Sequence, residues 1–349
     1  MAETMISILM PFYPQTLSAL LNQPSFLPAE AQDAVGFSGI PPSSQTEVVS
    51  FSKWFDTVVH LSSQLFSALA YLHDDAKIAH RDVKPLNIML THLSLEELLQ
   101  RPDSLKLIDY GISTDIVEPD GRPRRPKTND AGTGAFRAPD LIFAPQAGYD
   151  GAAVDVWAAG CVIAMFLTGL VDQSVSVQAE EGDSSDDEDW DDEEFRSFDG
   201  PGLGLRATNH ADPEREEEDD PLPSEEVIES FKEPEWRRKE LFDIPYPSDI
   251  PLAANIFQLK GLPSDLAAWP EAAHYNPSLA TMPFARSQPT DILFRLPVAA
   301  HYINAGRDID GKISQFVSVI SQCTSLSAAS RPSASLTAGL LSKKCRLLR

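Results

Sequence analysis

The polar side chains of residues 80–87, His-Arg-Asp-Val-Lys-Pro-Leu-Asn, have the types and spacing that a phosphoryl transfer needs. The carboxylate of Asp82 can accept the proton of an attacking hydroxyl group, and the amide of Asn87, five residues later, can reach back to a magnesium ion. Lys84 lies between them and can neutralise charge on the transferred phosphoryl group. Asp82 and Lys84 are therefore candidate catalytic residues, and Asn87 is a candidate metal ligand.

A second candidate metal ligand, Asp109, begins the tripeptide Asp-Tyr-Gly directly after the apolar stretch 105–108. By itself this tripeptide indicates only a turn. In its position after residues 80–87, it resembles the metal-binding tripeptide of eukaryotic protein kinases with a tyrosine in place of phenylalanine, and residues 80–87 resemble their catalytic loop. The resemblance implies ATP and Mg²⁺ as cofactors, with Lys84, Asn87 and Asp109 at the phosphates.

Three charged residues, Asp140, Asp155 and Arg331, match positions with structural roles in that family. Asp140 ends the tripeptide Ala-Pro-Asp, where the family has glutamate, and Arg331 is at the position of its buried partner. Because aspartate is one methylene group shorter, we expect this pair to be strained or bridged by water. Asp155 resembles the buried acid that hydrogen-bonds the backbone of the catalytic loop, since a buried carboxylate needs such partners.

The residues around the catalytic loop resemble those of serine/threonine kinases, because Lys84 follows the catalytic aspartate and Thr133 precedes the Ala-Pro-Asp tripeptide. The resemblance implies that the hydroxyl of Thr133 hydrogen-bonds near Asp82 and Lys84, as a third catalytic residue. Residues 134–139 and 255–263 resemble the cyclin-dependent-kinase-like group, and fungal kinases that activate cyclin-dependent kinases. This implies a protein substrate such as a cyclin-dependent kinase, a cyclin-like or chaperone partner, and a role in cell-cycle or transcription signalling.

Thr128 matches the position that cyclin-dependent kinases phosphorylate in the loop between the Asp-Tyr-Gly and Ala-Pro-Asp elements. The resemblance implies a regulatory role in which Arg81 binds the phosphate, with the basic side chains of residues 122–127 as further donors. The alternative is an ordinary exposed threonine in a polar loop.

The residues before the catalytic loop provide only part of an ATP site. Met10 falls at the gatekeeper position of the family, and Pro11 and Tyr13 fall at the hinge, whose backbone binds adenine. No glycine-rich loop and no strand with a phosphate-binding lysine precede the catalytic loop in this sequence. We therefore expect weak or no activity of this chain alone. Two interpretations stay open, a kinase whose sequence is shortened here and a truncated pseudokinase that acts as a protein-binding scaffold.

The elements that must position these residues are mainly α-helical with short β-strands, as in a protein-kinase large lobe with only a remnant of the small-lobe sheet. Apolar residues recur at helical spacing over 51–73, and the stretch 154–168 is apolar on every side, which is typical of a central buried helix. We expect further helices near 250–259, 311–323 and 333–345, and strands at 88–90 and 105–108.

Composition and the resemblance to protein kinases together imply five segments. They are the end of the small lobe and hinge (1–22), a flexible loop (23–50), the large lobe (51–171), an acidic disordered insertion (172–240) and the remainder of the large lobe (241–349). Residues 180–240 hold 25 Asp and Glu against 7 Lys and Arg, so they carry −18 of the chain's net charge of −24.

Several classes of protein are excluded by composition. An acidic surface repels phosphates, so we expect no nucleic-acid partner. The longest apolar stretch, 154–171, is interrupted by Asp155 and two glycines, which favours a buried helix over a membrane span. The three cysteines, Cys161, Cys323 and Cys345, are odd in number and far apart. They indicate a reducing intracellular compartment, the cytoplasm or nucleus.

Overall fold

The computed structural model describes residues 10–32, 49–143, 145–173, 236–244, 248–263, 266–275, 278–282 and 284–345. The chain divides into two compact units, one of Met1–Val171 with Trp236–Arg349 and the other of Asp172–Glu235. Nearly all of the second unit, and with it most of the predicted acidic insertion 172–240, lies outside the described residues. The same holds for much of the predicted loop 23–50.

The first unit is built mainly from helices, as predicted. They are α1 (Leu17–Leu21), α2 (Ala29–Gln32), α3 (Phe51–Ala70), α4 (Leu95–Gln100), α5 (Pro139–Ile142), α6 (Gly151–Ala164), α9 (Asp249–Lys260), α10 (Pro297–Asn304), α11 (Lys312–Cys323) and α12 (Ala334–Leu340). Helix α3 continues into a π-helical turn, Tyr71–Ala76, and α12 into another, Leu341–Cys345.

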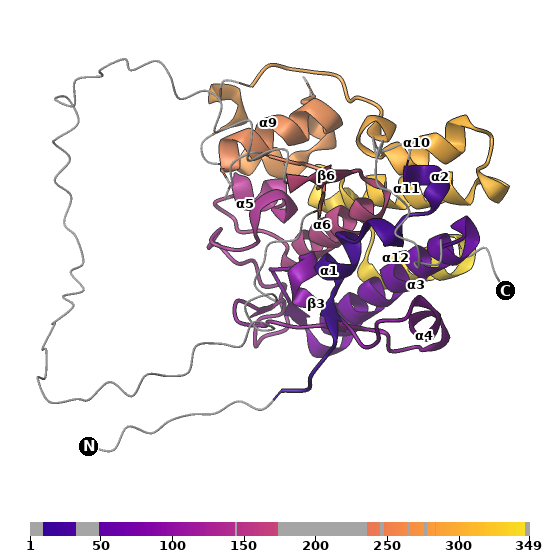
Figure 1. Cartoon of the computed structure of the whole chain (residues 1–349). Helices are drawn as coiled ribbons and strands as arrows, with labels where there is room; N and C mark the ends of the chain where they lie inside the picture. The colour runs from indigo at the N-terminus through magenta and orange to yellow at the C-terminus, as the bar shows by residue number, and fades with distance from the viewer. Residues whose placement is uncertain are drawn as a thin grey trace, which may run out of the picture. The chain divides into compact units, whose positions relative to one another are not determined.

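Helix α6 is the centre of the hydrophobic core. Nearly every residue along it is buried, including Trp157 on one face and Val162 on another, which agrees with its apolar sequence on all sides. It contacts α3 and α11, and α3 packs lengthwise against α12 (Figure 1). Gly160 permits the close approach to α11, because a Cβ atom there would lie 2.7 Å from the Cβ of Cys323.

Helix α3 forms because its apolar residues share one face and its first turn is capped. The hydroxyl of Ser50 accepts a hydrogen bond from the backbone N–H of Lys53, which satisfies one of the free donors at the helix start. Trp54, Phe55 and Val58 are fully buried on the apolar face. The helix therefore anchors the segment that leads into residues 80–87.

Among the described residues, seven short strands form three small sheets, one of three strands and two of two strands each. The strands are β1 (Gln15–Thr16), β2 (Ile78–Ala79), β3 (Ile88–Leu90), β4 (Leu105–Leu107), β5 (Thr114–Asp115), β6 (Leu170–Asp172) and β7 (Trp236–Arg238). They pair in the orders β1-β3-β4, β2-β5 and β6-β7. Residues 80–87 link β2 to β3, and Asp109 follows β4, so these short strands set the positions of the candidate site.

Candidate active site

The carboxylate of Asp82 meets the side chains of Lys84 and Thr133 in one cluster. The hydroxyl of Thr133 donates to Asp82 Oδ1 at 2.7 Å, and Lys84 Nζ donates to Thr133 Oγ1 at 2.9 Å. Lys84 Nζ also lies 2.8 Å from Asp82 Oδ2. The structure thus brings together the three residues predicted to be catalytic, although Thr133 is 51 residues from Asp82 in the sequence.

The environment of Asp82 keeps its carboxylate ionised. Burial on its own raises the pKa of this group, but hydrogen bonds from Lys84 and Thr133, the charge of Lys84 and a hydrogen bond from Asn87 outweigh it, so the pKa lies below the ordinary value. A carboxylate held in this way can accept a hydrogen bond, and then a proton, from a hydroxyl group placed beside it.

The two predicted metal ligands, Asn87 and Asp109, leave oxygen atoms free. The amide nitrogen of Asn87 donates to the backbone oxygen of Asp82 at 2.9 Å and to its Oδ2 at 3.0 Å, and the amide oxygen makes no hydrogen bond within the described ranges. Asp109 is exposed, and its Oδ1 accepts only a 3.3 Å hydrogen bond from the backbone of Gly111.

Asn87 and Asp109 are held near each other by the backbone. The backbone N–H of Ile108 donates to the backbone oxygen of Asn87 at 2.9 Å, so Asp109 directly follows a residue that is hydrogen-bonded to Asn87. An amide oxygen and a carboxylate suit Mg²⁺, which is bound through one or two protein ligands together with substrate phosphates. In the part of the chain that the structure describes, no group of three or more His, Cys, Asp or Glu residues could hold a metal ion by itself. The donor set therefore fits Mg²⁺ held jointly with a nucleotide.

Asp155 fastens the start of the catalytic segment, as the resemblance implied. Its Oδ2 accepts from the backbone N–H of His80 and its Oδ1 from that of Arg81, both at 2.7 Å. His73 Nε2 lies 2.9 Å from the same carboxylate. Asp155 is fully buried in α6, so these contacts tie residues 80–81 to the central helix.

Two residues of the site have positive φ angles without being glycine, Arg81 at 72° and Asp109 at 66°. Such backbone conformations cost about 1–3 kcal/mol each and persist only where surrounding contacts enforce them. The hydrogen bonds that Asp155 accepts from the backbone N–H groups of residues 80–81 provide that enforcement at Arg81. The site therefore uses the rigid core to hold its backbone in place.

The side chain of Arg81 contacts Thr128, the predicted phosphorylation site. Arg81 Nη2 lies 3.2 Å from Thr128 Oγ1 and 3.3 Å from its backbone oxygen, which also accepts from the hydroxyl of Tyr149 at 3.0 Å. The basic side chains predicted as further donors to a phosphate at Thr128 make other contacts. Three basic residues before Thr128 pair with acids instead: Arg122 with Asp120, Arg124 with Asp115 and Glu118, and Arg125 with Asp150.

Asp140 and Arg331 are in direct contact, so the expectation of a bridging water is wrong. Arg331 Nη2 donates to Asp140 Oδ2 at 2.6 Å, and both side chains are buried. Arg331 also donates to the backbone oxygens of Ser325, Ala153 and Leu326, and it lies over the Trp157 ring at 5.1 Å. The short helix α5 brings Asp140 close enough that the missing methylene group is not needed.

The predicted gatekeeper and hinge residues lie at the edge of the described structure. Met10 and Pro11 are exposed, and Tyr13 is half-buried just before β1. Strand β1 pairs with β3, so Gln15 opposes Leu90 and Thr16 opposes Met89. The segment therefore reaches the sheet next to the candidate metal ligands, while its role in binding adenine stays a prediction.

Sequence reasoning missed two histidines that shape the site. The backbone N–H of Asp82 donates to His80 Nδ1 at 3.2 Å, so the other ring nitrogen, Nε2, carries the proton donated to the oxygen of Ile108 at 2.9 Å. His73 supports Asp155, as described above. Both residues are buried, and a buried histidine needs partners, which is the signal that could have drawn attention to them.

Comparison with known proteins agrees with this geometry. Residues 45–210 match the family model of the protein kinase domain. Over these residues the chain is similar to protein kinases. The chain is 35% identical over 136 residues to the serine/threonine-protein kinase CAK1 of Saccharomyces cerevisiae, which covers 38% of the chain and 35% of the relative. It is 38% identical over 112 residues to the CTD kinase subunit alpha of Schizosaccharomyces pombe, 32% of the chain and 16% of the relative.

A solved structure supports the fold of the chain. The yeast RNA Pol II CTD kinase CTDK-1 complex matches over 94% of this chain and 67% of that chain, with a TM-score of 0.50 at 16% identity. Identity this low shows the fold alone, and it confirms the predicted kinase architecture. The curated relatives are matched over only about a third of their length or less, 35% for CAK1 and 16% for the CTD kinase subunit.

No helix among the described residues is long and apolar enough to span a bilayer.

Proposed function

We propose that the chain takes part in ATP-dependent phosphoryl transfer to serine or threonine hydroxyl groups of a protein substrate. The observation that carries this proposal is the shared contact of Asp82, Lys84 and Thr133, with both Asp82 and Lys84 bonded to the Thr133 hydroxyl. A protein hydroxyl group beside Asp82 would donate its proton to this carboxylate as it attacks the phosphorus atom. Lys84 would place a positive charge beside the transferred group.

In this proposal, Asn87 and Asp109 hold Mg²⁺ together with the phosphates of ATP. The ion supplies neutralisation of phosphate charge when it is bound. The contribution of the chain is to orient the two ligands. Asn87 is fixed by its hydrogen bonds to Asp82, and Asp109 follows Ile108, whose N–H donates to the backbone oxygen of Asn87. Asp155 acts indirectly, because it positions the backbone of residues 80–81.

The proposed substrate class is a protein such as a cyclin-dependent kinase, and a cyclin-like or chaperone partner would assist. Support comes from the similarity to CAK1, and from the fold neighbour, which is a kinase complex. We also propose an intracellular location in the cytoplasm or nucleus, supported by the buried thiols of Cys161 and Cys323, which form no disulfide among the described residues.

We propose that this chain by itself transfers phosphoryl groups only slowly. Two lysines, Lys53 and Lys77, precede Asp82 among the described residues, and Lys53 is engaged on α3, where its Nζ lies 3.8 Å from Glu96. The described part of the chain therefore offers no lysine aimed at the phosphates from a strand before Asp82. Because positioning supplies most of the rate in phosphoryl transfer, a partial clamp slows it strongly.

The test measures incorporation of labelled phosphate into a cyclin-dependent kinase over hours, with Mg²⁺ and ATP. We expect slow incorporation by the wild type that is lost in Asp82→Asn and Asp109→Asn. The matched control is Asp103→Asn, which removes an exposed carboxylate paired with Lys106 at 3.6 Å. Equal incorporation by the wild type and Asp82→Asn, including none by either, would favour the alternative of a pseudokinase scaffold.

A further inference from the structure

A second pocket lies apart from the candidate active site. It has a volume of about 900 Å³ and lies between the end of α9, residues 286–292, the end of α11 and residues 325–330. None of the residues assigned to the phosphoryl-transfer site lines it. Its size is within the range of small-molecule and peptide side-chain sites in proteins.

Lys260, the last residue of α9, lines this pocket without an acidic partner. Its Nζ donates to Thr324 Oγ1 at 2.6 Å. The hydroxyl of Thr324 donates in turn to the backbone oxygen of Ile320 at 2.8 Å, so it serves Lys260 only as an acceptor. Within the described ranges, no carboxylate lies within 4.0 Å of Lys260 Nζ, and two of its three N–H groups have no partner.

The position of Lys260 makes this lack of a partner costly. Burial lowers the pKa of its ammonium group to about 8, and the positive charge of Arg331 acts in the same direction. The positive group therefore lacks the solvation that an exposed lysine would have. A negative charge placed in the pocket would restore it.

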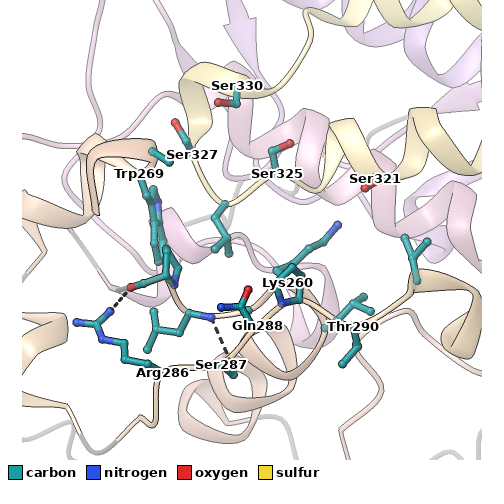
Figure 2. Close-up of a pocket in the computed structure, with 18 of the residues that line it drawn as sticks. Lys260, Trp269, Arg286, Ser287, Gln288, Thr290, Ser321, Ser325, Ser327 and Ser330 are labelled. Atoms are coloured by element: carbon teal, nitrogen blue, oxygen red, sulfur yellow. Dashed lines mark hydrogen bonds between the residues drawn. The ribbon is translucent and has the colours of Figure 1, made fainter. Parts of the chain in front are cut away.

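Other donors of the pocket are also unused. The hydroxyls of Ser321 and Ser330 are exposed and make no hydrogen bond within the part of the chain that the structure describes. Figure 2 shows the side chain of Lys260 pointing toward the wall that carries Ser321 and Ser325. The acidic residue of the lining, Asp291, accepts from the backbone N–H of Leu293 at the start of a helical turn.

We propose that this pocket binds a phosphomonoester dianion, with the ammonium group of Lys260 as its ionic partner and the hydroxyls of Ser321 and Ser330 as further donors. A phosphomonoester has about −1.5 to −2 charges and three acceptor oxygens, enough to use all three donors, whereas a carboxylate has two oxygens. The pocket is larger than a phosphate group, so the chain or molecule that carries the phosphate enters it as well. The half-buried Pro263 and Ile292 of the lining then contact that carrier.

The experiment uses the full chain in EDTA, so that no Mg²⁺ bridges a phosphate to Asn87 and Asp109. Calorimetry with phenyl phosphate should show saturable binding to the wild type. Lys260→Met should weaken it about 10- to 100-fold, as the loss of a charge-assisted hydrogen bond implies. Ser321→Ala and Ser330→Ala should each weaken it about 2- to 10-fold.

The matched control is Ser318→Ala, one turn before Ser321 on α11 and outside the pocket, which should bind as the wild type does. Asp82→Asn should also bind normally, which separates this site from the phosphoryl-transfer site. Circular dichroism checks that Lys260→Met is folded. If it is not, two other variants test the site: Lys260→Arg keeps the charge and should still bind phenyl phosphate, and the double variant Ser321→Ala/Ser330→Ala should bind it more weakly. Absence of saturable binding, or equal binding by the wild type and all pocket variants, overturns the proposal.

Two further probes distinguish the sources of the phosphate. A phosphoserine peptide that binds at least tenfold more tightly than inorganic phosphate identifies a phosphorylated protein segment as the occupant, with the unphosphorylated peptide as its control. Equal affinity of the two identifies the free anion. Both results support the site if Lys260→Met weakens the binding at least tenfold, and wild-type affinity of Lys260→Met for either probe counts against it.

Discussion

Arg331 donates to Asp140 at 2.6 Å across 191 residues of sequence, and both side chains are excluded from solvent. The pair joins α5, at the end of the segment that carries Thr133, to the start of the last helices. Because removal of one partner strands a buried charge, Asp140→Asn should lower the free energy of unfolding by about 3–5 kcal/mol. Urea unfolding measures this. The half-exposed pair of Arg137 and Asp249 is the control, and Asp249→Asn should cost at most about 1 kcal/mol. Similar losses in both variants would contradict a special role for the buried pair.

The pKa of Asp82 predicts how the activity depends on pH. Because this pKa is lowered in the fold, Asp82 adds stability above its unfolded pKa of about 3.9, and that stability is lost as pH falls through the lower folded value. Asp82 should therefore stay ionised throughout pH 6–8, and phosphate incorporation should show no acid limb from it there. Thr133→Ala removes a hydrogen bond that lowers the pKa, so the acid limb should move upward, while Thr133→Ser should keep the wild-type profile. An unchanged profile in Thr133→Ala would contradict the assignment.

Phosphorylation of Thr128 should strengthen its contact with Arg81. A phosphate there adds about −1.5 to −2 charges beside a guanidinium group that already lies 3.2 Å from the hydroxyl. We expect Thr128→Ala to reduce incorporation at least tenfold in chain that has been phosphorylated by an upstream kinase. Thr281→Ala, an exposed threonine elsewhere, should leave it unchanged. Full activity of Thr128→Ala would leave Asp82 as the base and remove the switch.

Glu240 should make the fold less stable as pH rises. Burial, together with the neighbouring Asp243, raises its pKa to about 7, although Arg237 opposes this. A raised carboxyl pKa means that the folded chain binds the proton more tightly, so the stability is present at low pH and is lost as pH rises through about 7. Glu240→Gln should therefore raise the free energy of unfolding by about 1 kcal/mol at pH 8 and change it little at pH 5. Denaturant titrations at both pH values check the sign, and a larger effect at pH 5 would be contrary to it.

Nucleotide binding by the chain should be weak and dependent on metal. Among the described residues, our proposal assigns Lys84, Asn87 and Asp109 to the phosphates, and Met10 and Pro11 are exposed. Calorimetry with magnesium-ATP should give a dissociation constant weaker than the micromolar range, and Asp109→Asn or EDTA should remove the signal. Micromolar affinity would show that the described residues form a more complete site than we propose.

The sequence by itself predicted the residues of the candidate site around Asp82, because Asp82, Lys84 and Asn87 are a few residues apart on one loop. When residues are this close in the sequence, the short backbone between them limits how far apart their side chains can lie. The long apolar runs likewise predicted α3 and α6, since periodicity is a local property. Asp109 could be predicted only from its order after the first motif.

Tertiary structure decided the rest, because contacts between distant residues depend on how the helices pack. The basic residues before Thr128 looked like phosphate donors in sequence, yet Arg125 pairs with Asp150, which packing brings beside it. The direct contact of Arg331 with Asp140 depends on the same packing, which compensated for the shorter side chain. Lys260 reads as an ordinary residue at a helix end, and only the arrangement of α9 beside α11 buries it without an acid. Burial and the choice of partner are properties of the folded core, and one-dimensional spacing does not contain them.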